Sequence, residues 1–132
     1  MSRAKNLANF QTTITDGTTS VATSFVTNGS AKAWINMDGT GTFDSDTIRA
    51  SLNVSGVTDN GTGDHSISFS SSFANANYAA SMSSSAGALS NTDTMVNPYT
   101  WATGSTSIGT NNHAGSVVDR SYVNLSINGD LA

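Results

Sequence analysis

The stretch Tyr122-Val-Asn-Leu-Ser-Ile-Asn128 alternates apolar and polar residues along its whole length. Successive side chains of a β-strand point to opposite faces, so Val123, Leu125 and Ile127 fall on one side. A period of two is typical of a strand with one buried face and one exposed face. The stretch therefore predicts a half-buried β-strand whose apolar face belongs to the core.

The same period occurs in three other parts of the chain. In Lys32–Met37 the residues Ala33, Ile35 and Met37 share one face, and Lys32, Trp34 and Asn36 share the other. Farther along, Ile48, Ala50, Leu52 and Val54 share a face. Residues 47–70 are predicted to form a hairpin that turns at Asn60-Gly61, with Ile67 and Phe69 pointing inward. A further strand is expected to begin with Tyr78, Ala80 and Met82.

Five to eight short strands at this spacing predict an all-β protein, a β-sandwich of short antiparallel strands. We expect the sandwich to occupy residues 31–132. Residues 1–30 have a different composition and are expected to form an N-terminal arm. Residues 11–30, rich in Thr, Ser and Gly, are interpreted as a β-arm, and residues 1–10 as one or two helical turns or an extended segment.

Composition narrows the function classes. Ser, Thr, Asn and Gly make up 66 of the 132 residues, Glu and Cys are absent, and only 11% of residues are charged. This composition excludes a helical bundle, and a net charge of −4 disfavours binding to nucleic acid. No apolar run is long enough for a membrane span or a secretory signal, so neither is expected. Large apolar residues are few, so the core is predicted to be thin and completed by association between subunits.

Several blocks of the chain resemble a module of tailed-phage virion proteins. They are, in order, Met1–Asn9, Ala31–Gly41, Ile48–Asp64, Ile67–Phe69, Ala74–Tyr78 and Tyr122–Ile127. Such modules form the C-terminal ends of tail fibres, and they also occur in head fibres and capsid decoration proteins. Only about twenty residues separate the start from the globular part, which favours a short spike or decoration subunit over a long fibre. The resemblance implies a non-enzymatic virion structural protein, made in the bacterial host cytoplasm and displayed on the virion surface.

The resemblance also implies partners. The expected partners are further copies of the chain, in the homotrimer that is typical of such modules, and other virion proteins such as capsid or tail subunits. Residues 1–30 are expected to dock the protein on the particle, with Arg3 and Lys5 meeting acidic groups and Leu7 and Phe10 filling apolar pockets. The alternative function is a receptor-binding tail-fibre adhesin that recognises a host surface glycan.

Aromatic residues with polar tips are the candidates for glycan or subunit contact. They are Trp34, Tyr99, Trp101 and Tyr122. Trp101 is expected in a loop from Pro98 to Gly104, where binding residues tend to collect. Trp34 and Tyr122 lie in predicted strands, and packing between subunits explains them equally well, because Trp and Tyr suit interfaces.

The sequence contains no convincing set of catalytic residues. His65 and His113 are the only histidines, and no nucleophile motif accompanies them, so no catalytic residue is assigned. No cofactor is expected. Asp38, Asp44 and Asp46 are a weak candidate for calcium, but the EF-hand pattern fails, because Thr40 and Thr42 occupy its third and fifth positions and Arg49 its twelfth, where a bidentate Glu is needed. Aspartates beside Gly, Ser or Thr more commonly cap turns, and that is the interpretation preferred here.

Overall fold

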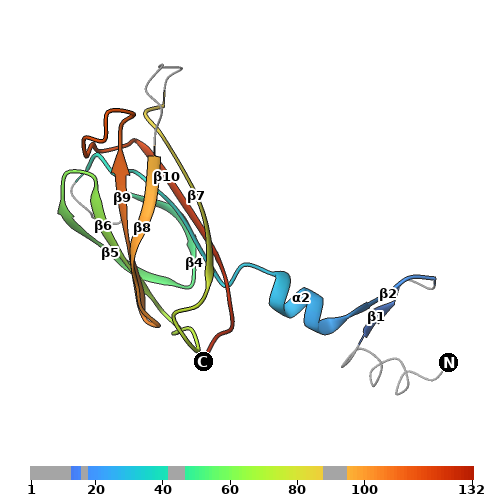
Figure 1. The fold of residues 1–132 in the computed structure, drawn as a ribbon. Coiled ribbons are helices and arrows are strands. Elements are labelled where there is room, and N and C mark those ends of the chain that lie inside the picture. Colours follow the sequence, from blue (N-terminus) through green and yellow to red (C-terminus); the bar gives the residue numbers. More distant parts are fainter. Residues whose placement is uncertain (1–12, 16–17, 42–46, 88–94) are drawn as a thin grey trace. The chain divides into compact units, whose positions relative to one another are not determined.

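The computed structural model describes residues 13–15, 18–41, 47–87 and 95–132. The chain divides into two compact units, residues 1–30 and residues 31–132, which are described separately. Figure 1 shows the elements of each unit. Every pair of neighbouring strands is antiparallel.

The first unit contains a two-stranded hairpin and a short helix. Strands β1 (Thr13–Thr15) and β2 (Ser20–Ala22) pair with each other, and helix α2 (Thr23–Gly29) follows directly. The helix was not expected, because these residues were interpreted as part of a β-arm. Within it the Thr27 hydroxyl donates to the carbonyl of Thr23 (3.0 Å). The Asn28-Gly29 pair, a turn signal in the sequence, stands at the helix end, and the Ser30 amide donates to the Val26 carbonyl (3.1 Å).

The second unit is a sandwich of two four-stranded sheets. The first, here called the β3 sheet, has the order β4-β3-β10-β7, and the second, the β6 sheet, has the order β5-β6-β9-β8. The strand bounds in the β3 sheet are β3 (Ala33–Met37), β4 (Ile48–Leu52), β7 (Ala79–Ser85) and β10 (Tyr122–Asn128). Those in the β6 sheet are β5 (Val54–Gly61), β6 (Asp64–Phe69), β8 (Met95–Trp101) and β9 (Ser105–Asn111). The predicted all-β sandwich is confirmed.

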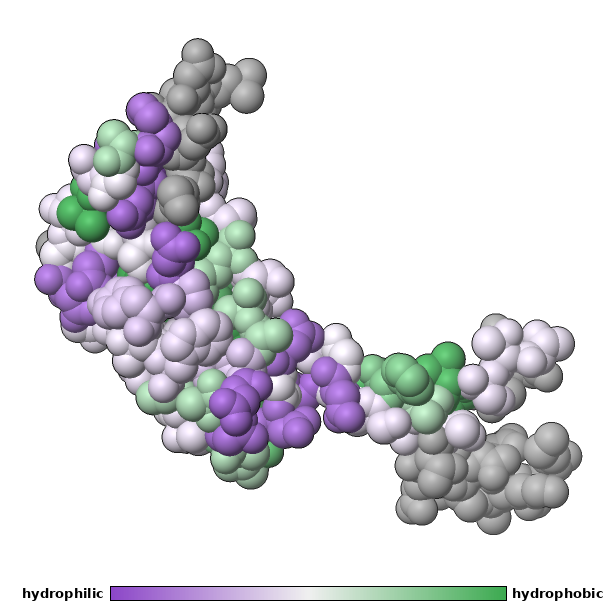
Figure 2. Space-filling model, viewed as in Figure 1, coloured by the Kyte–Doolittle hydropathy of each residue, from purple (hydrophilic) through white to green (hydrophobic). Residues whose placement is uncertain are grey.

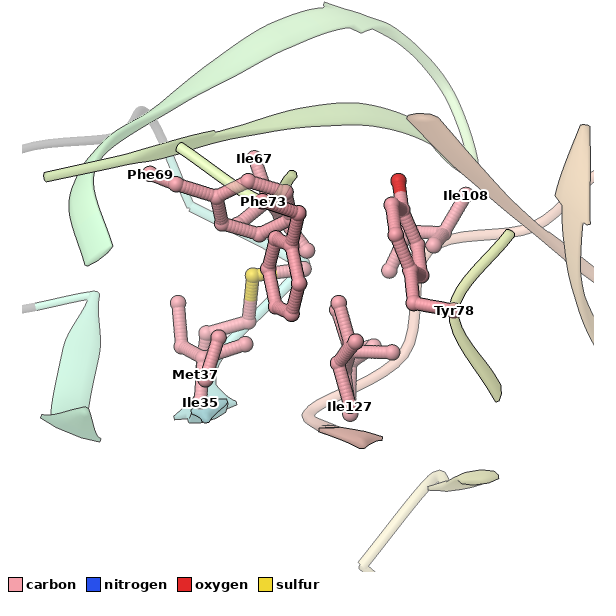
Figure 3. Close-up of a cluster of buried hydrophobic side chains, with 11 residues drawn as sticks. Ile35, Met37, Ile67, Phe69, Phe73, Tyr78, Ile108 and Ile127 are labelled. Carbon is pink, nitrogen blue, oxygen red and sulfur yellow. The ribbon is translucent and has the colours of Figure 1, made fainter. Parts of the chain in front are cut away.

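The core lies between the two sheets and is built from the alternate residues that the sequence pattern marked. Its buried members are Ala33, Ile35, Met37, Ile67, Phe69, Phe73, Tyr78, Ile108, Val123, Leu125 and Ile127. Figure 3 shows side chains from both sheets and from the connection after β6 pointing toward one another. The rings of Phe69 and Phe73 meet edge to face with centroids 5.0 Å apart, an arrangement that aromatic pairs favour.

The strand predicted over Ile48–Val54 is wrong in one respect. It breaks at Asn53, which has φ of 56°, so β4 belongs to one sheet and β5 to the other. The Asn53 side chain holds this corner, because it donates to the Ser71 carbonyl (3.0 Å) and accepts from the Ser71 amide (2.7 Å). The register of β3 and β4 is irregular between Asn36 and Met37, so Ala50 and Leu52 pair with the outward residues Asn36 and Trp34. They are exposed and do not join the core.

The predicted hairpin of residues 47–70 is therefore shorter than expected. Only β5 and β6 form it, and its turn lies at Thr62-Gly63, two residues beyond the predicted Asn60-Gly61. Gly63 has φ of +67°, a conformation that glycine adopts without steric strain. A Cβ atom at this position would also lie 2.6 Å from the Thr110 carbonyl oxygen, so the close approach of the β9 end requires glycine here.

Candidate functional site

The predicted docking residues Arg3, Lys5, Leu7 and Phe10 lie outside the residues that the structure describes. The described part of the first unit has several large hydrophobic side chains on its surface. Its exposed large hydrophobic side chains are Ile14, Val21, Phe25 and Val26. Phe25 is 75% exposed, and no residue of helix α2, all of which is described, is buried.

The four candidate aromatic residues do not converge on one site. Trp34 and Tyr122 lie on the outer face of the β3 sheet, Tyr99 lies on the outer face of the β6 sheet, and Trp101 is the last residue of β8. The loop expected around Trp101 is wrong, since Met95–Trp101 is a strand. The Trp101 ring packs on the ring of Tyr78 with centroids 5.0 Å apart, so it extends the aromatic part of the core.

Tyr99 is part of a polar cluster on the β6 sheet. Its hydroxyl donates to Asp64 Oδ1, and the same oxygen accepts from Asn60 Nδ2 (3.3 Å). The Asp64 contact raises the pKa of the Tyr99 phenol, because a carboxylate beside the hydroxyl disfavours a phenolate. Asn60 also donates to the Ser66 hydroxyl (2.9 Å), which bonds the Ser107 hydroxyl (3.0 Å). These groups satisfy one another and leave the Tyr99 hydroxyl already engaged.

Tyr122 is similarly engaged at one end of the β3 sheet. The guanidinium carbon of Arg49 lies 4.3 Å from the centre of its ring, and Arg49 also pairs with Asp38 (Nη2 to Oδ2, 3.0 Å). The Thr40 hydroxyl and amide both donate to Asp38 Oδ1. These bonds, and to a lesser degree the Arg49 charge, lower the pKa of Asp38, because they stabilise the carboxylate.

These contacts give Asp38 a structural role as a turn cap and ion-pair partner. Asp44 and Asp46, the other two members of the candidate calcium set, lie outside the described residues. Within the described ranges, no group of three or more His, Cys, Asp or Glu residues is placed to hold a metal ion.

Trp34 is the candidate aromatic that borders an open hollow. On the outer face of the β3 sheet, its indole borders a shallow, open hollow of about 340 Å³ that spans β3, β10 and β7. Its lining residues are Trp34, Ile35, Asn36, Ser81, Met82, Ser83, Asn124, Leu125 and Ser126. Trp34 is 37% exposed, so part of its ring is covered and part is available for contact.

A row of hydrogen-bonded side chains crosses the hollow. Asn36 Nδ2 donates to Asn124 Oδ1 on the neighbouring strand, and Asn124 Nδ2 donates to the Ser83 hydroxyl (3.2 Å) on the strand beyond. Asn36 pairs with Asn124 in the register of β3 and β10, and Asn124 pairs with Ser83 in that of β10 and β7. The sheet register therefore aligns the three polar side chains, which we call the amide row.

The amide row was not among the predicted site residues. A signal for it exists, since Asn36 and Asn124 occupy outward positions beside Trp34 and Tyr122 in the two most regular alternating stretches. What the sequence lacked was the pairing of β3 with β10, which joins segments almost ninety residues apart.

The two histidines lie in contrasting surroundings. His65 is fully buried on the inward face of β6, and burial lowers its pKa because the charged imidazolium is disfavoured there. His113 is exposed in the segment after β9. The two therefore do not form a common site, and His65 belongs to the core.

Comparison with known proteins finds no family model, no curated protein and no solved structure that matches the chain. In the parts of the chain that the structure describes, no helix has the length and apolar character needed to cross a membrane.

Proposed function

We propose that this chain is a bacteriophage virion structural protein, a short spike or capsid decoration subunit without catalytic activity. In this proposal residues 1–30 attach it to capsid or tail subunits, and residues 31–132 form the domain displayed on the virion surface. The proposal joins the sequence resemblance to the division of the chain into two units.

The observation that carries the proposal is the exposed apolar surface of the first unit. Phe25, Val26 and Val21 are all exposed, and Figure 2 shows green hydrophobic surface on the part of the chain that holds them. Apolar groups left in water are unfavourable by about 25 cal/mol per Å². A segment that presents several of them is stabilised by a partner surface that covers them.

The second unit has the properties of a displayed domain. It has its own core between two sheets, and its surface is dominated by short polar residues, which appear as pale colours over much of the sandwich in Figure 2. Such a surface stays hydrated without depending on charge, so it tolerates changes in salt concentration.

We also propose that the protein is a homotrimer. Among the residues that the structure describes, eleven hydrophobic ones are buried, which is a small core. Association between copies buries further apolar surface, and both units have exposed large hydrophobic side chains that it could cover. Native mass spectrometry of the full chain and of residues 31–132 tests this, with a trimer expected for the full chain.

Truncation tests the attachment. A protein of residues 31–132 is expected to keep the β-sheet circular dichroism of the full chain, and to be absent from particles when it replaces the full chain in the phage that encodes it. A matched variant, Phe25→Ser with Val26→Ser, keeps the chain length and is expected to weaken association with particles. Particles that carry the truncated protein at full occupancy would contradict the proposal.

A receptor-binding adhesin is the second candidate function. The observation that favours it is the hollow beside Trp34, since it combines an accessible aromatic ring with aligned amide groups. Two other candidate aromatic residues, Tyr99 and Trp101, are engaged in other contacts and do not line this hollow.

A further inference from the structure

We propose that the hollow on the outer face of the β3 sheet is a binding site for a neutral saccharide. In this site Trp34 stacks on the apolar face of one sugar ring, and the amide row binds its hydroxyl groups. The inference rests on the second candidate function, the adhesin, and is independent of how residues 1–30 attach.

Trp34 supplies the aromatic surface. It lies opposite Ser126 on β10 and Leu52 on β4, both on the outer face of the sheet. The indole forms one side of the hollow, and the serines of β7 form the other, with β10 between them. Because neighbouring strands are about 4.8 Å apart, the two sides are separated by about 10 Å. A single sugar ring and its substituents match a space of that width.

The amide row supplies hydrogen-bonding groups in fixed positions. An amide side chain has two N–H donors and one carbonyl acceptor, and the row uses one donor of Asn36 and one of Asn124. Each asparagine therefore retains a second donor. The Ser126 and Ser81 hydroxyls flank the row in the same hollow. A row already held by its own bonds loses little conformational freedom when a ligand binds.

The charge of the hollow selects the ligand class. Its lining residues are all uncharged, and the chain carries a net charge of −4. Phosphate, sulfate or carboxylate groups would meet no cation in the hollow and would be repelled by the whole protein. A ligand with hydroxyl groups, an apolar ring face and no charge fits these residues best, and neutral sugars have these properties.

The hollow differs from a wholly apolar docking groove, because the amide row crosses it. A second copy of the chain seated here would have to desolvate the amide row and match its donors, which is unfavourable unless each finds a partner. Sugar hydroxyls act as both donors and acceptors, so they meet that requirement directly.

The experiment uses the full chain and follows Trp34 directly. Trp101→Phe leaves Trp34 as the sole tryptophan, and its emission is titrated with methyl glycosides of glucose, galactose, mannose and N-acetylglucosamine, and with maltohexaose and cellohexaose. We expect saturable quenching with at least one probe. In ¹⁵N-labelled protein the side-chain amide signals of Asn36 and Asn124 are expected to shift with the same midpoint.

Variants locate the binding. Trp34→Ala and Asn124→Ala are each expected to weaken binding by about tenfold or more, measured by the amide shifts that remain. Tyr99→Phe, on the outer face of the other sheet, is the control and is expected to bind as the parent does. Near-ultraviolet circular dichroism and the melting temperature of each variant establish that it is folded.

Three results would overturn the inference. The first is that no probe binds saturably, and the second is that binding is unchanged in Trp34→Ala. The third is that the parent binds no saccharide while Trp34→Ala sediments as a smaller oligomer than the parent. The last result would assign the face to contact between copies. The attachment proposal is tested separately, by whether particles carry the protein of residues 31–132. Neither outcome of that test bears on saccharide binding, so failure of the saccharide inference and failure of the attachment proposal are distinguishable.

Discussion

Arg49 lies over the ring of Tyr122, with its guanidinium carbon 4.3 Å from the ring centre. The two residues come from β4 and β10, which are not neighbours in the sheet, because β3 lies between them. Arg49 also pairs with Asp38, just after β3. The Arg49 side chain thus connects β4, the residue that follows β3, and β10 on the outer face of the β3 sheet.

Breaking this contact should destabilise the protein modestly. A cation over an aromatic ring at an exposed site contributes about 0.5–1 kcal/mol. Tyr122→Leu and Arg49→Met are each expected to lower the free energy of unfolding, and the double variant should lose less than the two losses added together. Urea unfolding of the four proteins measures the coupling. Coupling near zero would show that the two side chains contribute independently.

The core predicts a sharp contrast between two aliphatic residues of the β3 sheet. Ile127 is fully buried, and Ile127→Ala should lower the free energy of unfolding by about 2–5 kcal/mol through lost burial and the cavity that remains. Leu52 is 48% exposed, and Leu52→Ala should change the free energy of unfolding by less than about 0.5–1 kcal/mol. Chemical denaturation measures both. Equal losses would contradict the exposed position of Leu52 on the outer face of the sheet.

Much of the sandwich could be predicted because alternation is a local property. In β3, β6 and β10 the residues on the apolar face of each pattern are the ones buried in the core. The period of two needs no knowledge of which strands pair. The same reasoning failed at Ile48–Val54, where the alternation continues across a corner. Nothing in that local pattern shows the chain leaving one sheet for the other.

The corner depends on a contact between distant residues. Asn53 adopts a positive φ that asparagine tolerates better than most residues, and its side chain bonds the backbone of Ser71. A single asparagine among fourteen carries no such information in the sequence. The candidate site failed to emerge for the same reason, because Trp34 and the amide row are aligned by pairing between strands.

Substitutions at Asn53 separate the two parts of its role. Asn53→Gly keeps the backbone conformation but loses both side-chain bonds to Ser71, and is expected to lower the free energy of unfolding by about 1–3 kcal/mol. Asn53→Ala loses the same bonds and also strains the backbone, which costs about 1–2 kcal/mol more. Thermal and urea unfolding measure the relative stabilities of the parent, Asn53→Gly and Asn53→Ala. If Ala were as stable as Gly, the left-handed conformation would not be required at this corner.

His65 is buried between the sheets, and burial has a larger effect on its pKa than the charges of the acidic residues that act on it. Asp59, Asp119 and Asp64 each act to raise its pKa, but desolvation has the larger effect, so the pKa of His65 is lowered from 6.5. The folded state therefore holds the imidazole neutral under conditions in which the unfolded chain binds a proton. Stability must depend on pH wherever the two states differ in bound protons.

The expected direction follows from that difference. Between the folded pKa and 6.5 the unfolded state binds more protons, so the free energy of unfolding should fall as the pH drops below about 6.5, by up to about 1.4 kcal/mol per pH unit. Above that range His65 contributes no pH dependence. Urea unfolding from pH 5 to 8 measures the slope. His65→Gln should flatten it, and His113→Gln, at an exposed position, should leave it intact. A slope that persists in His65→Gln would assign the pH dependence to other groups.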